Sequence, residues 1–236
     1  MKNHILHRWD LSPSEAVRIQ EALKGKIRLR FPKIFPQRIA AGDVAYDRSG
    51  AILYGAFLSF SYPDLMLLER SWARRKVTFP YIPGLLTFRE APVLLQAFYR
   101  LTSLPDVILL DGQGIAHPRR LGIAAHLGLL LNRPSIGCGK SRLVGHHENP
   151  GEALGSFVPL MDGEETIGAV VRTREGVKPI YVSPGHKMDV EHSVRLILSL
   201  CRGYRIPEPL RQAHIFVNSL KSLKIERKLP PRSSRP

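Results

Sequence analysis

The 236-residue chain contains only two cysteines, Cys138 and Cys201, and they form no C-x-x-C pair. Two cysteines argue against a disulfide scaffold in a chain of this length. A structural zinc site needs four ligands, usually in two close pairs, and only Cys138, His146 and His147 cluster here. We therefore expect both cysteines to be buried free thiols.

Long apolar runs are also missing. No stretch approaches the roughly 20 apolar residues that a helix needs to cross a bilayer. The first residues, MKNHILHRWD, lack the apolar core and the cleavage site of a signal peptide. We expect a cytoplasmic protein without a membrane partner.

Acidic residues are scarce. Asp and Glu total 20 against 35 Lys and Arg, which leaves a net charge of +15, and the cations concentrate in 18–38, in 70–76 and after 221. Such an excess favours a polyanionic partner, because contacts with many phosphates give affinity through counterion release. A basic protein without catalytic activity, including one associated with the ribosome, would show the same excess. The charge therefore points to nucleic acid and leaves catalysis open.

Two glycine-rich segments look like nucleotide-binding loops, and each lacks a required residue. LLDGQGIAHPRRLGIAAH, residues 109–126, has His117 where the G-x-G-x-x-G fingerprint needs its third glycine, and Asp111 would repel a pyrophosphate. PSIGCGKS, residues 134–141, has Pro134 where the P-loop needs glycine. We expect no nucleotide cofactor.

Sequence patterns predict an α/β protein with a mixed sheet flanked by helices. Strands at 38–47, 51–60 and 64–73, the first two joined by a hairpin turn at 47–50, predict a three-stranded antiparallel meander. A strand at 105–111, a helix at 119–132 and a strand at 134–138 predict parallel pairing. The other expected elements are a strand pair at 165–173 and 178–185, and four helices. The first helix, 12–24, is expected to begin with a capping box of Ser12 and Glu15. The others are expected from about 85 to 101, at 188–203 ending at Gly203, and at 207–220. We expect one domain over 1–220 and a basic, disordered tail at 221–236.

Three of the scarce acids lie in apolar segments: Asp43 in IAAGDVAY, Glu90 in LLTFREAP and Asp111 at the end of VILLD. Asp and Glu are seldom buried without a cationic partner or a metal. One interpretation is a set of buried ion pairs, for example Glu90 with Arg89 or Arg119. The other is a Mg²⁺ site, because Mg²⁺ prefers oxygen ligands and keeps several waters, so that two or three carboxylates suffice. Burial alone does not separate these interpretations.

A carboxylate-bound metal in a very basic protein suggests metal-assisted cleavage of a phosphodiester. One metal would ready a water as the nucleophile while another stabilises the leaving oxygen. Lys140, after the tight GCG turn, could neutralise the non-bridging oxygens of the scissile phosphate.

Several segments together resemble the endonuclease V family of deoxyinosine-specific repair nucleases. In order, between about Arg38 and about His214, they are RIAAGDVAYD, PYIPGLLTFREAP, LLDGQGIAHPRRLGIAAHLGLLLNRPSIGCGKSRLVG, YVSPGH and CRGYRIPEP. The resemblance implies an RNase H-like fold and a Mg²⁺- or Mn²⁺-dependent cut at the second phosphodiester bond 3′ to the damaged base, leaving a 3′-hydroxyl and a 5′-phosphate. The implied partner is DNA containing deoxyinosine, and we expect a monomer.

Two other functions stay open beside this one. Some relatives prefer inosine-containing RNA, so an inosine-specific ribonuclease is an alternative. A catalytically silent nucleic-acid-binding protein on the same fold is the other, although its sequence would be expected to lack one of the acids, and none is missing.

The resemblance also implies roles for individual residues. The family's metal-binding acids, catalytic lysine and two active-site histidines fall on Asp43, Glu90, Asp111, Lys140, His117 and His214. For each histidine, a hydrogen-bonded structural role is the alternative.

The stretch PYIP, comprising Pro80, Tyr81, Ile82 and Pro83, looks like the family's wedge, which separates strands beside the lesion. Wedges and base flipping both require unstacking, which costs a few kcal/mol and least at a damaged pair. The flipped hypoxanthine would enter a pocket formed by backbone around three residues: Gly84, Leu86 and Gly112. A proline-stiffened surface loop is the structural alternative.

The chain departs from the family's pattern at two places. Gln113 stands where many members have histidine, and GCGKS differs from the commoner GVAKK or GVAKS. Neither departure removes an acid or the lysine, so the expected activity stands. Gln113 could alter a contact behind the site or the tolerance for different lesions.

Overall fold

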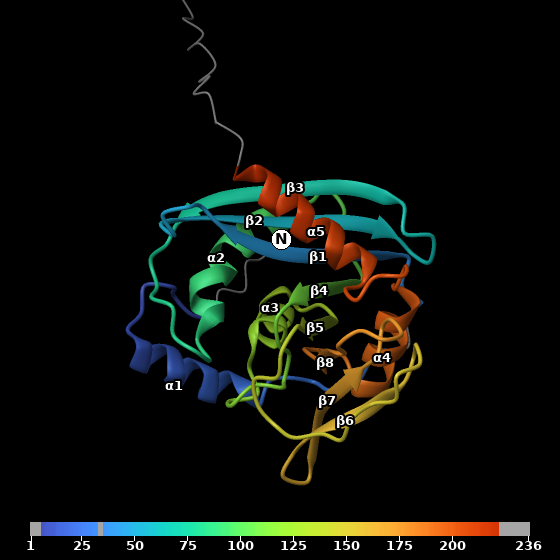
Figure 1. Ribbon diagram of the computed structural model, residues 1–236. Helices are drawn as coiled ribbons and strands as arrows, with labels where there is room; N and C mark the ends of the chain where they lie inside the picture. The colour runs from blue at the N-terminus through green and yellow to red at the C-terminus, as the bar shows by residue number, and fades with distance from the viewer. Residues whose placement is uncertain (1–5, 33–34, 222–236) are drawn as a thin grey trace, which may run out of the picture.

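A mixed sheet of eight strands forms the centre of the molecule, in the order β3-β2-β1-β4-β5-β8-β7-β6 (Figure 1). The computed structural model describes residues 6–32 and 35–221, so all but the first residue of the predicted tail lies outside it. The strands are β1 (Arg38–Tyr46), β2 (Ile52–Ser61), β3 (Leu67–Lys76), β4 (Val107–Asp111), β5 (Ser135–Gly139), β6 (Phe157–Asp162), β7 (Glu165–Val171) and β8 (Ile180–Pro184). The helices are α1 (Pro13–Lys24), α2 (Leu86–Phe98), α3 (Ile123–Leu131), α4 (Val190–Ser199) and α5 (Glu208–Leu220).

The predicted antiparallel meander is confirmed: β1 pairs with β2, and β2 with β3. The β1–β2 turn closes with a hydrogen bond from the Gly50 N–H to the Asp47 carbonyl (3.0 Å), and Gly50 takes the φ of +71° that favours glycine. β3 begins three residues later than predicted. The Ser61 N–H bonds the Met66 carbonyl (2.9 Å), so residues 62–66 form the turn and extended pairing resumes only at Leu67.

The predicted parallel pairing is also confirmed, since β4 pairs in parallel with β1 and with β5. The helix between them is shorter than the predicted 119–132. Arg120 has a φ of +55°, which interrupts a helix, so α3 starts at Ile123. At its other end Asn132 is left-handed and caps the last turn.

Other boundaries were predicted with mixed success. The capping box of α1 is present, with Glu15 N–H bonded to Ser12 Oγ and Ser12 N–H to the Glu15 carboxylate. The predicted helix 188–203 is wrong at its end: α4 stops at Ser199, because the chain turns there and the Glu208 N–H returns to the Leu200 carbonyl (3.0 Å). Strand β6 was not predicted, since it is an edge strand with Pro159 inside and no clear alternation.

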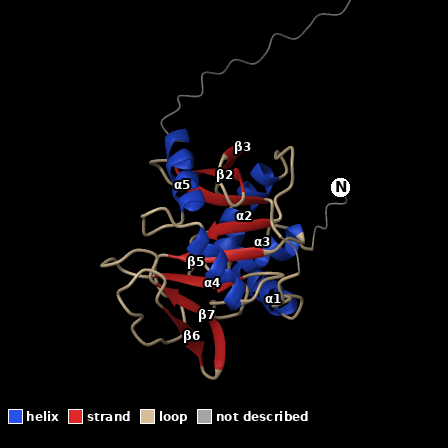
Figure 2. Ribbon diagram, turned by 90° about the vertical axis from the view of Figure 1, so that its right-hand side faces the viewer, coloured by secondary structure: helices blue, strands red, loops and turns tan. Residues whose placement is uncertain are grey.

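Helices cover both faces of the sheet (Figures 1 and 2). Along β4, Val107 and Leu109 pack with residues of α4 and α5 on one face, while Ile108 and Leu110 pack with α2 and α3 on the other. This alternation buries the central strands on both sides, and their carboxyl ends form one edge where functional side chains can meet.

No helix in the described part of the chain is both long and apolar enough to cross a membrane. Both cysteines are free thiols. Cys138 is buried in β5 as predicted, but the prediction is wrong for Cys201, which is only partly buried just after α4.

Candidate active site

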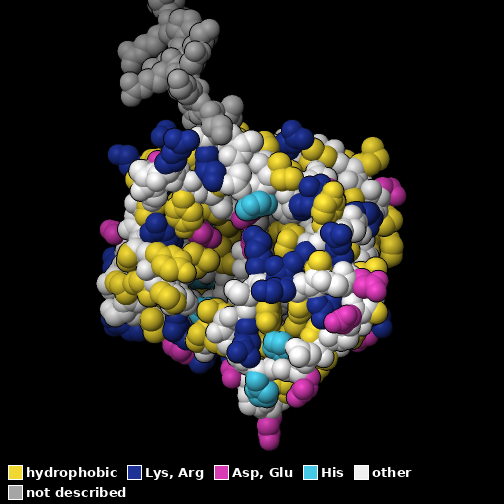
Figure 3. Space-filling model, viewed as in Figure 1, with side chains coloured by type: hydrophobic (Ala, Val, Ile, Leu, Met, Phe, Trp, Pro, Cys, Tyr) yellow, Lys and Arg dark blue, Asp and Glu magenta, His cyan; other side chains and the backbone are white. Residues whose placement is uncertain are grey.

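A hollow of about 480 Å³ opens at the carboxyl ends of β1 and β4. On the face shown in Figure 3, lysine and arginine side chains border it together with acidic side chains and a histidine. The predicted site residues that line it are Asp43, Tyr81, Ile82, Pro83, Gly84, Leu86, Glu90, Asp111, Gly112, His117, Lys140 and His214. Pro80 is exposed and does not line it. The fold therefore brings all but one of the predicted residues together.

Asp43 and Asp111 come from adjacent parallel strands. Gly42 pairs with Leu110. Asp43 and Asp111 are the next residues of these two strands, so they lie at the same level of the sheet. Gly42 has a structural reason to lack a side chain, because a Cβ would lie 2.7 Å from atoms of Leu110 and Phe57. The position of the two carboxylates thus depends on close packing directly behind them.

His214, from α5, completes a group of three possible metal ligands. Asp43, Asp111 and His214 each offer one ligand atom, and these atoms all lie within 4.8 Å of one another. The His214 Nδ1 lies 2.8 Å from Asp43 Oδ2, while the Val44 N–H donates to Asp43 Oδ1 at 2.8 Å. Both oxygens of Asp43 are therefore oriented by neighbours.

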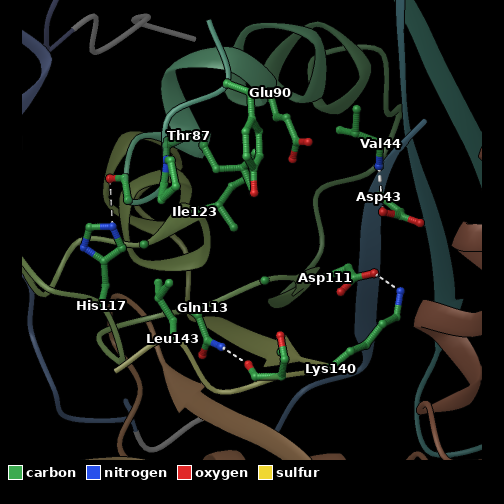
Figure 4. Close-up of a pocket in the computed structure, with 18 of the residues that line it drawn as sticks. Asp43, Val44, Thr87, Glu90, Asp111, Gln113, His117, Ile123, Lys140 and Leu143 are labelled. Atoms are coloured by element: carbon green, nitrogen blue, oxygen red, sulfur yellow. Dashed lines mark hydrogen bonds and ion pairs between the residues drawn. The ribbon is translucent and has the colours of Figure 1, made fainter. Parts of the chain in front are cut away.

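Glu90 reaches the same hollow from α2 but stands outside this group of three (Figure 4). Its Oε1 accepts a hydrogen bond from the Tyr46 hydroxyl (2.8 Å). It pairs with neither arginine considered from the sequence. Arg89 donates instead to Tyr46 Oη and the Phe79 carbonyl, and Arg119 to Gln20 and the Gly84 carbonyl.

The electrostatics of the acids favour a bound cation. Burial, reinforced by the charges of Asp43 and Asp111, raises the pKa of Glu90 to about 7. Burial and the charge of Asp111 also raise the pKa of Asp43. A divalent cation would offset this crowding of negative charge, and carboxylate oxygens are the donors that Mg²⁺ and Mn²⁺ prefer. The donor set therefore fits such an ion.

Lys140 follows β5 directly and extends its ammonium group to Asp111 Oδ2, with which it forms an ion pair (Figure 4). Both side chains are partly exposed. The ammonium group therefore lies at the solvent-facing rim of the carboxylates.

His117 lies across the hollow from these groups (Figure 4). Its Nδ1 accepts from the Arg119 N–H (3.1 Å), so its Nε2 carries the proton that it donates to the Gly84 carbonyl (2.9 Å). Burial lowers the pKa of His117 to about 4, which keeps the ring neutral at pH 7. These contacts support the structural role that the sequence left open for this histidine.

The Gly84 carbonyl receives two further hydrogen bonds, from Arg119 Nη2 (2.8 Å) and Gln20 Nε2 (3.0 Å). Gly84 has a φ of +79° and directly follows the PYIP stretch. Sequence reasoning missed Gln20, a fully buried residue of α1. The sequence does indicate that Gln20 is buried, because it falls on the same helical face as Ala16 and Leu23.

The PYIP stretch projects from this anchored base. Tyr81 is 69% exposed, whereas Ile82 packs against the buried cluster that contains Phe79 and Leu85. The Leu85 N–H returns to the Ile82 carbonyl (2.9 Å). An aromatic ring is therefore presented to solvent at the edge of the hollow on a fixed loop.

Gln113 is buried behind the segment that carries Lys140. Its Nε2 donates to the Ser141 carbonyl (3.0 Å), and its amide fills the space beside Gly139, where a Cβ would lie 2.2 Å from Nε2. This departure from the family's pattern therefore lies in the wall of the hollow itself, where Gln113 supports the backbone beside Lys140.

The chain is similar to known proteins over most of its length. A family model described as Endonuclease V matches residues 21–215. A protein named endonuclease V from Methanothrix thermoacetophila is 49% identical over 228 residues, which are 96% of this chain and 99% of that relative.

Solved structures are similar as well. Endonuclease V from Streptomyces avermitilis has a TM-score of 0.85 and 39% identity, covering 91% of this chain and 95% of that one. Endonuclease V from Ciona intestinalis has a TM-score of 0.80 and 26% identity, covering 90% and 99%. The Ciona protein was crystallised with a 23mer DNA containing an inosine followed by a ribo-adenosine.

Proposed function

Because the chain belongs to the endonuclease V family, we propose that it is a metal-dependent endodeoxyribonuclease that recognises deoxyinosine and hydrolyses the second phosphodiester bond 3′ to it. The products would be a 3′-hydroxyl and a 5′-phosphate. The observation that carries the proposal is the convergence of Asp43, Glu90, Asp111 and Lys140 in one hollow, beside the exposed ring of Tyr81. The inosine-containing DNA bound by the Ciona relative supports the choice of lesion.

Asp43, Asp111 and Glu90 would hold Mg²⁺, with Mn²⁺ as a substitute. When bound, such an ion lowers the pKa of a water nucleophile and stabilises charge on the phosphate. The chain's own contribution is to fix the ligands: the Val44 N–H and His214 orient Asp43, and the Tyr46 hydroxyl orients Glu90.

Lys140 is placed to stabilise the scissile phosphate. Its ammonium group already contacts Asp111 at the rim, so a phosphate oxygen that approaches the same carboxylates lies within its reach. Donors held in position before the reaction avoid the cost of reorganisation, and removing one such donor typically lowers kcat by about 10²–10³.

The other side of the hollow would receive the flipped base. Tyr81, exposed on its fixed loop, would stack on an unpaired neighbour, while backbone of Gly84, Leu86 and Gly112 would line the hypoxanthine. Gly112 has a φ of +142°, and a Cβ there would lie 2.7 Å from the Ile123 side chain. Packing against Ile123 therefore requires a glycine at this position, and the Gly112 backbone, which lines the hollow, would border a bound base.

A nicking assay tests the proposal. An end-labelled inosine duplex, a matched undamaged duplex and an inosine-containing RNA are incubated with and without Mg²⁺, and the cut is mapped. We expect a cut one nucleotide beyond the lesion's own 3′ phosphate in the DNA only when the metal is present. Preferential cutting of the RNA would replace this function by the ribonuclease alternative.

The variant Asp111→Asn tests the metal assignment in the same assay. We expect nicking to fall by more than the 10–100-fold that is typical when a residue supporting a metal ligand is lost. Binding of the inosine duplex should stay measurable by fluorescence anisotropy. Full nicking by this variant would remove Asp111 from the metal site, and no cleavage of any inosine substrate by the wild type would favour a silent binding protein.

A further inference from the structure

A second concave surface lies at the opposite end of the sheet from the catalytic hollow. Two adjoining hollows of about 500 and 520 Å³ share Arg28, Asn132 and Lys187. Asp106 lines one of them directly before β4, whereas Asp111 ends the same strand in the catalytic hollow. Five residue-to-residue steps along the strand separate the two acids, or about 16 Å at 3.3 Å per residue. The two surfaces are therefore separated by the length of one strand, and they share no lining residue.

This surface, here called the basic hollow, is defined by five cations, Lys26, Arg28, Arg30, Arg133 and Lys187, with the half-buried Phe31 among them. None of the five forms an ion pair with an acid among residues 6–32 and 35–221. The ammonium group of Lys187 contacts the Asn132 carbonyl at 3.4 Å. Among the residues that line this surface, five cations therefore stand against one carboxylate, that of Asp106, and none of them is paired with it.

The nearby acids are engaged elsewhere. Asp106 Oδ2 accepts the backbone N–H groups of Gln37 (2.8 Å) and Arg38 (3.0 Å). Asp189 caps α4 and accepts from the Phe31 N–H (3.4 Å). Both carboxylates hold the backbone in place, and Arg28 and Arg30 are exposed to solvent.

Hydrogen bonds hold the backbone segment that carries three of these cations. The Arg28 N–H donates to Nδ1 of the buried His186 (3.4 Å), and the His186 N–H donates to Ser135 Oγ (2.9 Å), which ties the 25–32 segment to β5. The ring of Phe31 packs against the ring of His192, with 5.0 Å between the two ring centroids. Burial, followed by the charges of Lys187 and Arg28, lowers the pKa of His186 to about 4, as expected beside a positive surface. The backbone that carries Arg28 is therefore held in place before a ligand binds, which lowers the entropic cost of binding.

We propose that the basic hollow binds the sugar-phosphate backbone of a second nucleic-acid segment, remote from the strand being cut. Three of the five cations are arginines, whose planar donors match phosphate oxygens. The surface is concave and Phe31 is half-buried within it, whereas a lipid surface would call for exposed apolar side chains. The inference rests on the polynucleotide substrate of the proposed function and is independent of inosine recognition.

Such a surface would hold the enzyme on DNA between lesions. The catalytic hollow is lined by three acids and only two basic side chains, Lys140 and Arg142, so it is a poor source of non-specific affinity. The basic hollow supplies charge at a place where bound DNA does not compete with the flipped base.

A charge-matched pair of variants tests the proposal. One carries Arg28→Ser, Arg30→Ser and Lys187→Ser. The control carries Arg48→Ser, Arg174→Ser and Lys178→Ser, three exposed cations outside the cation-rich segments, none of which forms an ion pair within the described chain. The catalytic hollow is saturated with a short unlabelled inosine oligonucleotide, and binding of a long, undamaged, fluorescent single strand is measured over a range of salt concentrations.

We expect the slope of log Kobs against log salt to fall by about 2 in the basic-hollow variant, because three lost phosphate contacts at about 0.7 each amount to that change. The control should change far less, and nicking of a short inosine duplex should be unaltered in both. An equal decrease of the slope in both variants, or no decrease in the basic-hollow variant, would overturn the proposal. So would a loss of binding to anionic vesicles with strand binding intact.

Two further measurements keep the outcomes distinct. The single charge reversal Arg30→Glu, at an exposed side chain, repeats the test if the triple variant unfolds at a lower temperature than the control. If the wild type does not nick inosine DNA at all, the proposed function fails, while strand binding without the competitor still decides the role of the basic hollow.

Discussion

Gln20 is a residue whose importance is visible only through its contacts. Its Nε2 donates to the carbonyls of Gly84 (3.0 Å) and Leu121 (3.1 Å), and its Oε1 accepts from Arg119 Nε (2.5 Å). One side chain from α1 thus joins the base of the PYIP stretch to the loop before α3. All of these groups serve the side of the hollow proposed to receive the base.

The variant Gln20→Leu keeps the volume of the side chain but removes its hydrogen bonds. We expect the free energy of unfolding to fall by about 1–3 kcal/mol, because buried partners are left unsatisfied. We also expect KM for inosine DNA to rise more than kcat falls, since Gly84 is displaced while the carboxylates are not. Urea unfolding and steady-state nicking measure the two effects.

The control for this variant is Gln37→Leu at an exposed position. It should leave both quantities close to wild type. A stability loss in Gln20→Leu without any change in KM would show that the network has only a structural role.

Among the elements, the loop between β3 and α2 combines an exposed tip with buried ends. Phe79 and Leu85 are 2% exposed each, and Tyr81 between them is 69% exposed. Burial on both sides holds the tip without covering it. Tyr81 therefore contributes to contacts with a ligand and little to the stability of the fold.

The variant Tyr81→Ala tests this separation. Stacking of one base on an aromatic ring is worth about 1–3 kcal/mol, so binding of inosine DNA should weaken by about 5–150-fold while the melting temperature stays within error. Fluorescence anisotropy and thermal unfolding give the two values. Tyr99→Ala, another exposed tyrosine outside the hollow, is the control, and equal losses of affinity in both variants would contradict a wedge role for Tyr81.

Over the whole molecule, buried histidines make stability depend on pH. The His7 Nδ1 donates to the Arg8 carbonyl (2.7 Å), so its Nε2 accepts from the Nε2–H of the fully buried His126 (2.8 Å). This leaves His126 Nδ1 without a partner within the described chain. Burial lowers the pKa of His126 to about 3, and no acceptor awaits a second proton there.

Because the folded pKa is lower than the unfolded value of about 6.5, the unfolded state binds more protons between pH 6.5 and 3. The stabilisation of the folded state by the neutral His126 ring is complete above pH 6.5 and is lost as the pH falls towards 3. We expect His126 to contribute a slope of about 1.4 kcal/mol per pH unit in this window. Urea unfolding between pH 7 and 5 should show that slope reduced in His126→Leu and retained in His192→Gln, at an exposed histidine. Equal slopes in wild type and His126→Leu would contradict the assignment.

Local patterns were sufficient for much of the fold. The capping box of α1, the turn at Gly50 and the antiparallel meander follow from neighbouring residues, and each is confirmed. The predictions failed at the start of α3, where Arg120 takes a positive φ, and at β6, an edge strand that carries Pro159. Neither feature leaves a periodic signal in the chain.

The sequence by itself determined the inventory of the site: scarce acids in apolar segments, a lysine after a buried strand and a stiff aromatic loop, all local chemistry that composition and resemblance reveal. Only the tertiary structure decided that Asp43 and Asp111 stand at one level of the sheet, because parallel pairing joins strands 68 residues apart. It also brought His214 to Asp43 across 171 residues. The basic hollow has the same origin, since its cations come from segments that only folding places together.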